Sequence, residues 1–142
     1  MKILYFKQGD KLLTGISTDK GVIDISSFTF SFGKKNILIS PYLEDIAEIK
    51  GSKEIFSNVS ELIPETELVI GISVPNPSKI ICIWLNYRRH AIESGMAIPT
   101  VPVAFTKYNN TLTDYGSDVS LGKEGEQFDY EVELGVVIGK KI

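Results

Sequence analysis

The stretch DYEVELGVVI at residues 129–138 decides how the fold is interpreted, because an acidic strand face leads there into an apolar run. Side chains on an extended strand alternate between two faces, so Asp129, Glu131 and Glu133 share one face. Carboxylates at that spacing repel one another, and a hard divalent cation with oxygen ligands is their natural counter-ion. Such a face is more often simply the solvated side of an amphipathic strand. The acidic row alone leaves both interpretations open.

The apolar run Leu134–Ile138 continues this strand toward a protein interior. An uninterrupted apolar sequence is typical of a strand that is buried on both faces. The sequence therefore predicts a single strand from about Phe128 to Ile138.

Length, charge and composition exclude several classes of protein. The 142 residues suffice for one domain, or for a small domain and part of a larger one. The net charge of -3 comes with no basic stripe, so we expect no nucleic-acid partner. Apolar runs such as Ile80–Leu85 are far too short to span a bilayer, so we expect no membrane partner.

The expected location is cytoplasmic. Lys7 and Asp10 interrupt the N-terminal apolar residues before the core of a signal peptide can form. Cys82 is the single cysteine, so the chain contains no disulfide framework, and this fits a reducing compartment.

Residues 1–74 are predicted to form a small N-terminal α+β domain. Short apolar runs separated by turns that contain Gly and Asp predict strands, and a spacing near the helical period predicts two helices. The predicted strands cover residues 2–6, 12–17, 22–25 and 67–72, and the predicted helices cover residues 41–50 and 56–62.

Residues 75–142 are the second predicted domain, which begins at a linker containing Pro75 and Pro77. We predict a buried strand over 80–85, a short helix over 86–95 that ends at Gly95, and a strand over 103–107. Polar loops are expected over 109–116 and 122–127, before the strand at 128–138. The predicted fold class is α+β and rich in β-structure.

The single histidine, His90, lies three residues before Glu93, so the two side chains share a face of the predicted helix. A carboxylate beside an imidazole determines its tautomer and raises its basicity, as a general base requires. Arg88 and Arg89 make the local field positive, which suits an anionic carboxylate ligand. Lys107, at a predicted strand end, could stabilise an oxyanion or enolate. Each of these features also occurs on ordinary protein surfaces.

Taken together, these residues resemble the fumarylacetoacetate hydrolase family, including its bacterial acylpyruvate hydrolases. The segments that carry the resemblance are KIICIWLNYRRHA (79–91), ESGM (93–96), PTVPVAF (99–105) with Lys107, and FDYEVELGVVIGK (128–140). The resemblance covers about residues 77–142, in the family's order and spacing. Residues 1–70 are similar, more loosely, to the small N-terminal domain of many bacterial members.

The resemblance implies a mixed β-roll, of which residues 75–142 are the first, incomplete part. It implies that Mg²⁺, Mn²⁺ or Ca²⁺ chelates a small 2-oxo or 1,3-dicarbonyl acid whose carbon–carbon bonds are cleaved or rearranged. Glu131 and Glu133 match the metal ligands. His90 matches the base that activates a water together with Glu93, and Lys107 matches the lysine near the substrate carbonyl. We expect a homodimer.

The chain departs from the family pattern at Trp84, Arg89 and Tyr108, where the family usually has glycine, aspartate and proline. The family's third metal carboxylate lies beyond residue 142, so we expect a truncated metal-dependent hydrolase, decarboxylase or isomerase. The alternative is a non-catalytic remnant that acts as an oligomeric interaction module or as a cation-binding module.

Overall fold

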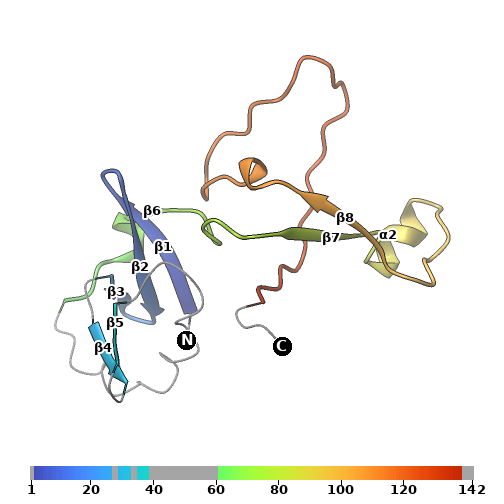
Figure 1. The fold of residues 1–142 in the computed structure, drawn as a ribbon. Coiled ribbons are helices and arrows are strands. Elements are labelled where there is room, and N and C mark those ends of the chain that lie inside the picture. The colour runs from blue at the N-terminus through green and yellow to red at the C-terminus, as the bar shows by residue number, and fades with distance from the viewer. Residues whose placement is uncertain (1, 27–28, 33–34, 39–60, 139–142) are drawn as a thin grey trace. The chain divides into compact units, whose positions relative to one another are not determined.

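The computed structural model describes residues 2–26, 29–32, 35–38 and 61–138 (Figure 1). The predicted helix at 41–50 and most of the one at 56–62 lie outside these residues. The chain divides into two compact units: Met1–Ser73 with Asp114–Ile142, and Val74–Thr113. These two units do not test the predicted domain boundary between residues 74 and 75, so that boundary stays a prediction.

The first unit is built on an antiparallel sheet. It contains β1 (Lys2–Gln8), β2 (Lys11–Thr18), β3 (Gly21–Asp24) and β6 (Val69–Ile70), in the order β3-β2-β1-β6. The three N-terminal strands confirm the prediction. The predicted strand at 67–72 is shorter than expected, because a 3₁₀ turn, η3 (Glu65–Glu67), precedes β6. A further antiparallel pair joins β4 (Thr29–Phe32) to β5 (Lys35–Leu38).

The core of this unit lies around β1, β2 and β3. Tyr5 and Phe6 are consecutive on β1 and both buried, as are Val22 and Ile23 on β3. Because consecutive strand residues face opposite sides, both faces of the sheet are covered there. Residues 61–73 are tied to the sheet by backbone hydrogen bonds, such as the 2.8 Å bond from the Val22 N–H to the Ile63 carbonyl.

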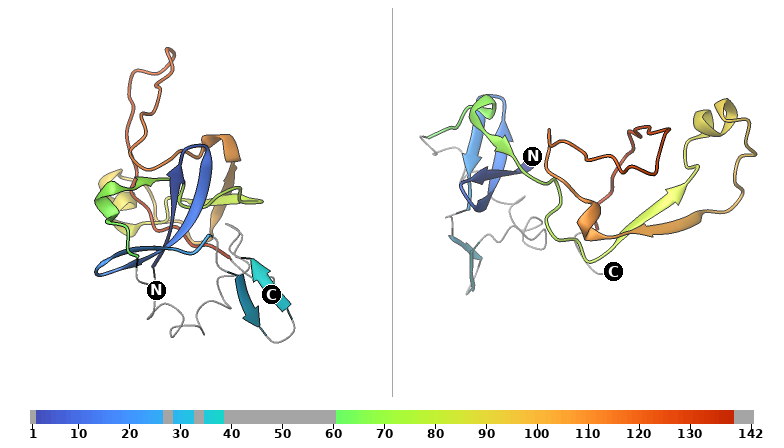
Figure 2. Two further views of the ribbon diagram at one scale, coloured as in Figure 1. Left: turned by 90° about the vertical axis from the view of Figure 1, so that its left-hand side faces the viewer. Right: turned by 90° about the horizontal axis from the view of Figure 1, so that it is seen from above.

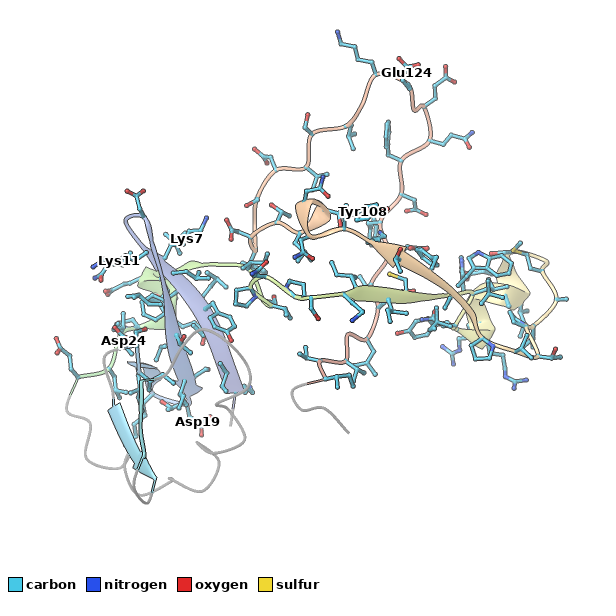
Figure 3. All side chains as sticks on the ribbon, in the orientation of Figure 1. Lys7, Lys11, Asp19, Asp24, Tyr108 and Glu124 are labelled. Atoms are coloured by element: carbon cyan, nitrogen blue, oxygen red, sulfur yellow. The ribbon has the colours of Figure 1, made fainter. Side chains whose placement is uncertain are left out.

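Turn residues determine the register of the β1–β2 hairpin. Gly9 has φ +60°, a conformation that glycine adopts without a steric penalty. The turn joins Gln8 to Lys11, which are direct partners in the ladder. Lys7 and Lys11 project at this end of the hairpin, whereas Asp19 lies in the turn after β2 (Figure 3).

The second unit is a hairpin with a helix in its connection. The strands β7 (Ile80–Trp84) and β8 (Val103–Lys107) pair antiparallel, and α2 (Arg88–Glu93) lies near the end of β7 (Figures 1 and 2). A 3₁₀ turn, η4 (Asn109–Thr111), follows β8. The predicted strand, helix and strand are all present, but the first strand is not buried as expected: Ile81 is 61% exposed and Trp84 is 44% exposed. The hairpin has only two strands, so β7 has a single neighbouring strand in the part of the chain that the structure describes. The structure is β-rich with little helix.

The predicted strand at 128–138 is wrong for this structure. Residues 112–138 are all described and contain no helix or strand. Apolar residues there are exposed, Val132 by 86%. A strand exists only when a neighbour supplies partners for its N–H and C=O groups, and no described strand pairs with this segment. Glu124 lies in the loop ahead of it (Figure 3). Across the described ranges, no helix combines the length and apolar character that crossing a membrane requires.

Candidate active site

The helix α2 begins and ends through backbone hydrogen bonds. Tyr87 is extended, and its carbonyl accepts a 3.1 Å hydrogen bond from the Ala91 N–H. At the other end Gly95 has φ +65°, and its N–H donates to the Ile92 carbonyl at 3.1 Å. The Met96 N–H donates to the Ala91 carbonyl at 2.9 Å, which completes a Schellman motif. The prediction that Gly95 ends the helix is confirmed.

His90 and Glu93 form a hydrogen-bonded pair on α2. The distance from Nδ1 of His90 to Oε1 of Glu93 is 3.0 Å. The side chains are 50% and 71% exposed, so water screens the pair and it contributes little to stability. The hydrogen bond matters more for the chemistry of His90 than for stability. A carboxylate acceptor at Nδ1 keeps the imidazole proton on that nitrogen and leaves Nε2 as the basic nitrogen. The structure thus brings two predicted site residues together.

Arg88 and Arg89 begin the same helix and are both exposed. Residues two apart on a helix do not face each other, so Arg88 and His90 lie on different sides of α2. Arg89 is four residues before Glu93 and therefore lies nearer to the face that carries the pair. Ala91 is fully buried and marks the side on which α2 packs.

Lys107 lies at the other end of the hairpin from α2. It pairs with Ile80 at the start of β7, whereas Val103 pairs with Trp84 at the end of β7 that leads to α2. Four residues along a strand span about 13 Å. The structure therefore does not bring Lys107 next to the His90–Glu93 pair, as the position of β8 illustrates (Figure 1).

Glu131 and Glu133 belong to the irregular segment after residue 112, in the unit that does not contain α2. Both are exposed, and Asp129 accepts a 2.8 Å hydrogen bond at Oδ1 from the Tyr130 N–H. Carboxylate oxygens suit Mg²⁺, Mn²⁺ and Ca²⁺. Within the described ranges, however, no three His, Cys, Asp or Glu side chains gather as a metal site requires. The donors fit a cation in chemistry, and their arrangement here is not that of a formed site.

Sequence reasoning missed Leu85, which lies between β7 and α2. Its backbone has φ +51°, in the left-handed region that leucine rarely adopts, and its side chain is 9% exposed. Nothing in the sequence signals this conformation, because left-handed residues are expected to be Gly, Asn or Asp. The neighbouring Trp84 is 44% exposed, so its bulk lies partly in solvent.

The comparisons with known proteins agree on one family. Residues 79–142 match the family profile described as "Fumarylacetoacetate (FAA) hydrolase C-terminal". Over these residues, the chain belongs to the fumarylacetoacetate hydrolase family. The matched region contains every candidate site residue.

Relatives in this family include proteins named as enzymes. The chain is 29% identical over 121 residues to the mitochondrial oxaloacetate tautomerase of Rattus norvegicus, covering 85% of this chain and 38% of that protein. It is 41% identical over 99 residues to the 2,4-didehydro-3-deoxy-L-rhamnonate hydrolase of a Sphingomonas strain, covering 69% and 33%. A fumarylacetoacetate hydrolase domain-containing protein 2 homolog of Dictyostelium discoideum is 49% identical over 65 residues, covering 46% and 21%.

Two facts follow from the lengths of these matches. The match to the Rattus protein is longer than residues 79–142, so the similarity extends into the N-terminal part. The chain spans between about a fifth and two fifths of the length of these relatives.

Proposed function

We propose that this chain is part of a hydrolase or isomerase of small 2-oxo or 1,3-dicarbonyl acids, in which His90 is the general base. The observation that carries the proposal is the 3.0 Å contact between Nδ1 of His90 and Oε1 of Glu93. The names of the relatives support the class of reaction, since one is a tautomerase of a 2-oxo acid and another is a hydrolase.

The same pair serves both kinds of reaction. With the proton on Nδ1 held by Glu93, Nε2 of His90 takes a proton either from the carbon beside the 2-oxo group or from a water. The first transfer leads to an enol, and the second prepares the water for attack on a carbonyl. In both cases the Glu93 carboxylate stabilises the imidazolium that forms.

Four further residues belong to the proposal, and the support for each differs. Glu131 and Glu133 supply two carboxylates for Mg²⁺, Mn²⁺ or Ca²⁺, an ion that would polarise the substrate carbonyl as a Lewis acid. The role of Lys107, which would stabilise developing negative charge, rests on the sequence resemblance. The expected β-roll rests on the same resemblance. The role of Arg88, which would bind the substrate carboxylate, rests on its charge and on its nearness in sequence to His90.

The decisive test is turnover by the 142-residue chain with Mg²⁺ or Mn²⁺. Oxaloacetate tautomerisation and acylpyruvate hydrolysis are followed for the parent, His90→Gln and Glu93→Gln. A general base contributes about a hundred- to ten-thousand-fold, so His90→Gln should lose that factor. Glu126→Gln is the matched control, because it removes one exposed carboxylate outside the pair. Equal rates for parent and His90→Gln would remove His90 from the mechanism.

Arg88 is tested against its neighbour. Arg88→Ala and Arg89→Ala remove the same charge from adjacent exposed positions of α2. A larger rise in KM for Arg88→Ala supports the predicted carboxylate contact. Equal rises would mean that only the local positive field matters.

Exposed apolar surface favours a second candidate function, that of a non-catalytic interaction module. Ile81 on β7 is 61% exposed and Phe105 on β8 is 44% exposed, and a two-stranded hairpin is marginally stable alone. Apolar surface of this kind is usually covered by another surface. Sedimentation of the parent chain distinguishes the candidates: a homodimer or larger assembly without turnover supports the module, whereas a monomer that turns over substrate excludes it.

The cytoplasmic location remains part of the proposal. It rests on the single cysteine, which fits a reducing compartment. Fluorescence of the tagged chain in its own cells tests it, and a signal confined to an organelle or envelope would contradict it.

A further inference from the structure

Leu85 combines two features that rarely occur together. It has φ +51°, a conformation that places Cβ close to its own carbonyl and disfavours residues other than Gly, Asn and Asp. It is also one of the few buried apolar residues of the second unit, where the other with comparable burial is Ala91. Strained backbone persists only where the surrounding structure determines it, and it is concentrated at functional sites.

The position of this residue explains what the strain achieves. Leu85 directly follows the last residue of β7, and only Asn86 and Tyr87 separate it from α2. A left-handed residue turns the chain sharply, so the direction in which α2 leaves the strand depends on this backbone angle.

The rotation of α2 about its axis follows from a second burial. Ala91 is fully buried, so its side of the helix faces inward. His90 and Glu93 lie on other positions of the helix and are half-exposed or more. Because α2 has only six residues, a change in the turn at Leu85 that distorts the start of the helix also alters the contact between Nδ1 of His90 and Oε1 of Glu93.

We propose that Leu85 is a positioning residue for the His90–Glu93 pair, and that it acts through its left-handed backbone rather than through the volume of its side chain. This inference rests on the proposed function of that pair. A general base needs the correct tautomer as well as the correct position, so a distortion of the helix that carries His90 and Glu93 affects it.

The chain offers two unique probes for a test in the full protein. His90 is the single histidine and Trp84 the single tryptophan, so one imidazole and one indole signal are observed without assignment. The ¹⁵N shifts of the neutral imidazole report which ring nitrogen carries the proton, and Glu93→Ala defines the shifts without the carboxylate. Trp84 emission and circular dichroism report whether each variant is folded.

Two substitutions separate the backbone from the side chain. Leu85→Gly adopts the left-handed region freely but loses the buried side chain, whereas Leu85→Val keeps an apolar side chain but is β-branched and opposes that region. We expect Leu85→Gly to keep the parent ¹⁵N shifts, and Leu85→Val to move them at least halfway to the Glu93→Ala values. Leu85→Met is the control, and its shifts should equal those of the parent.

The opposite order would overturn the inference: if Leu85→Gly moves the shifts more than Leu85→Val, the side chain is what matters. Should Leu85→Val unfold, Leu85→Asn and Leu85→Ala replace it, because both lose the apolar side chain but Asn tolerates the left-handed region. Asn must then keep the parent shifts better than Ala, and the reverse order overturns the inference. If Glu93→Ala itself leaves the shifts unchanged, the proposed function of the pair fails and the inference fails with it.

Discussion

The backbone N–H of Met96 donates a 2.9 Å hydrogen bond to the carbonyl of Ala91, across Gly95 at φ +65°. This bond closes the C-terminal end of α2 only three residues after Glu93. The His90–Glu93 pair therefore lies in the last turn of a six-residue helix, where its geometry depends on the residues on either side.

Gly95→Ala should destabilise this end of α2 by about 1–2 kcal/mol, because alanine opposes the left-handed conformation. No atom lies within 4 Å of a Cβ built at Gly95, so the cost comes from the backbone alone. Urea unfolding followed by Trp84 emission measures it. Gly95→Asn should lose less stability than Gly95→Ala, since asparagine tolerates positive φ. Equal losses of stability in the two variants would contradict the explanation.

Gly15→Ala should destabilise the N-terminal sheet by about 1–3 kcal/mol through overpacking. A Cβ at Gly15 would lie 2.6 Å from Cγ1 of Val22 and 3.2 Å from Cδ1 of Leu4. Thermal unfolding followed by circular dichroism gives the difference. Gly122→Ala is the matched control, because a Cβ there meets nothing within 4 Å, and it should leave the unfolding midpoint unchanged.

Tyr5→Phe should stabilise the chain by about 1 kcal/mol at neutral pH. The Tyr5 hydroxyl is buried and has no hydrogen-bond partner in the part of the chain that the structure describes. A buried hydroxyl without a hydrogen-bond partner has lost its hydration and gained no bond in return. Removing the hydroxyl should therefore raise the free energy of unfolding. Denaturant unfolding of parent and variant measures the gain, and a loss of stability would mean that the hydroxyl is satisfied in solution.

The same residue predicts a dependence of stability on alkaline pH. Burial raises the pKa of Tyr5 above its ordinary value of 10.0 in the folded chain. The unfolded chain therefore loses this proton first as pH rises, and the folded state binds more protons. Ionisation of Tyr5 therefore leaves the free energy of unfolding unchanged well below pH 10.0. Above that pH the free energy of unfolding falls, until the folded tyrosine also ionises. The difference between parent and Tyr5→Phe isolates this loss, and parallel pH profiles would contradict it.

Glu131→Gln and Glu133→Gln should each weaken binding of Mn²⁺ or Mg²⁺ by at least about tenfold, because each removes a charged oxygen ligand. Titration calorimetry on the 142-residue chain measures the affinity. Glu126→Gln, an exposed carboxylate a few residues earlier, is the control and should bind as the parent does. Equal binding by all four proteins would leave the acidic face without a cation site.

Local rules explain what could be predicted. The strand at β7 follows from its apolar run, and the end of α2 follows from Gly95, because each depends on residues next to one another in the chain. The spacing of His90 and Glu93 predicts their shared helix face for the same reason. Leu85 was missed because its left-handed backbone comes from its surroundings, which override the preference of leucine.

The sequence by itself determined the family, the N-terminal strands, the β7–α2–β8 order and the residues that pair on α2. Only the tertiary structure decided that residues 128–138 form no strand, because a ladder needs a partner and not only an apolar sequence. It also decided that Lys107 lies at the far end of the hairpin from His90, since the register of β7 with β8 is a property of two strands together. Neighbouring residues carry their own conformational preferences, whereas partners distant in the chain are chosen by packing and hydrogen bonding.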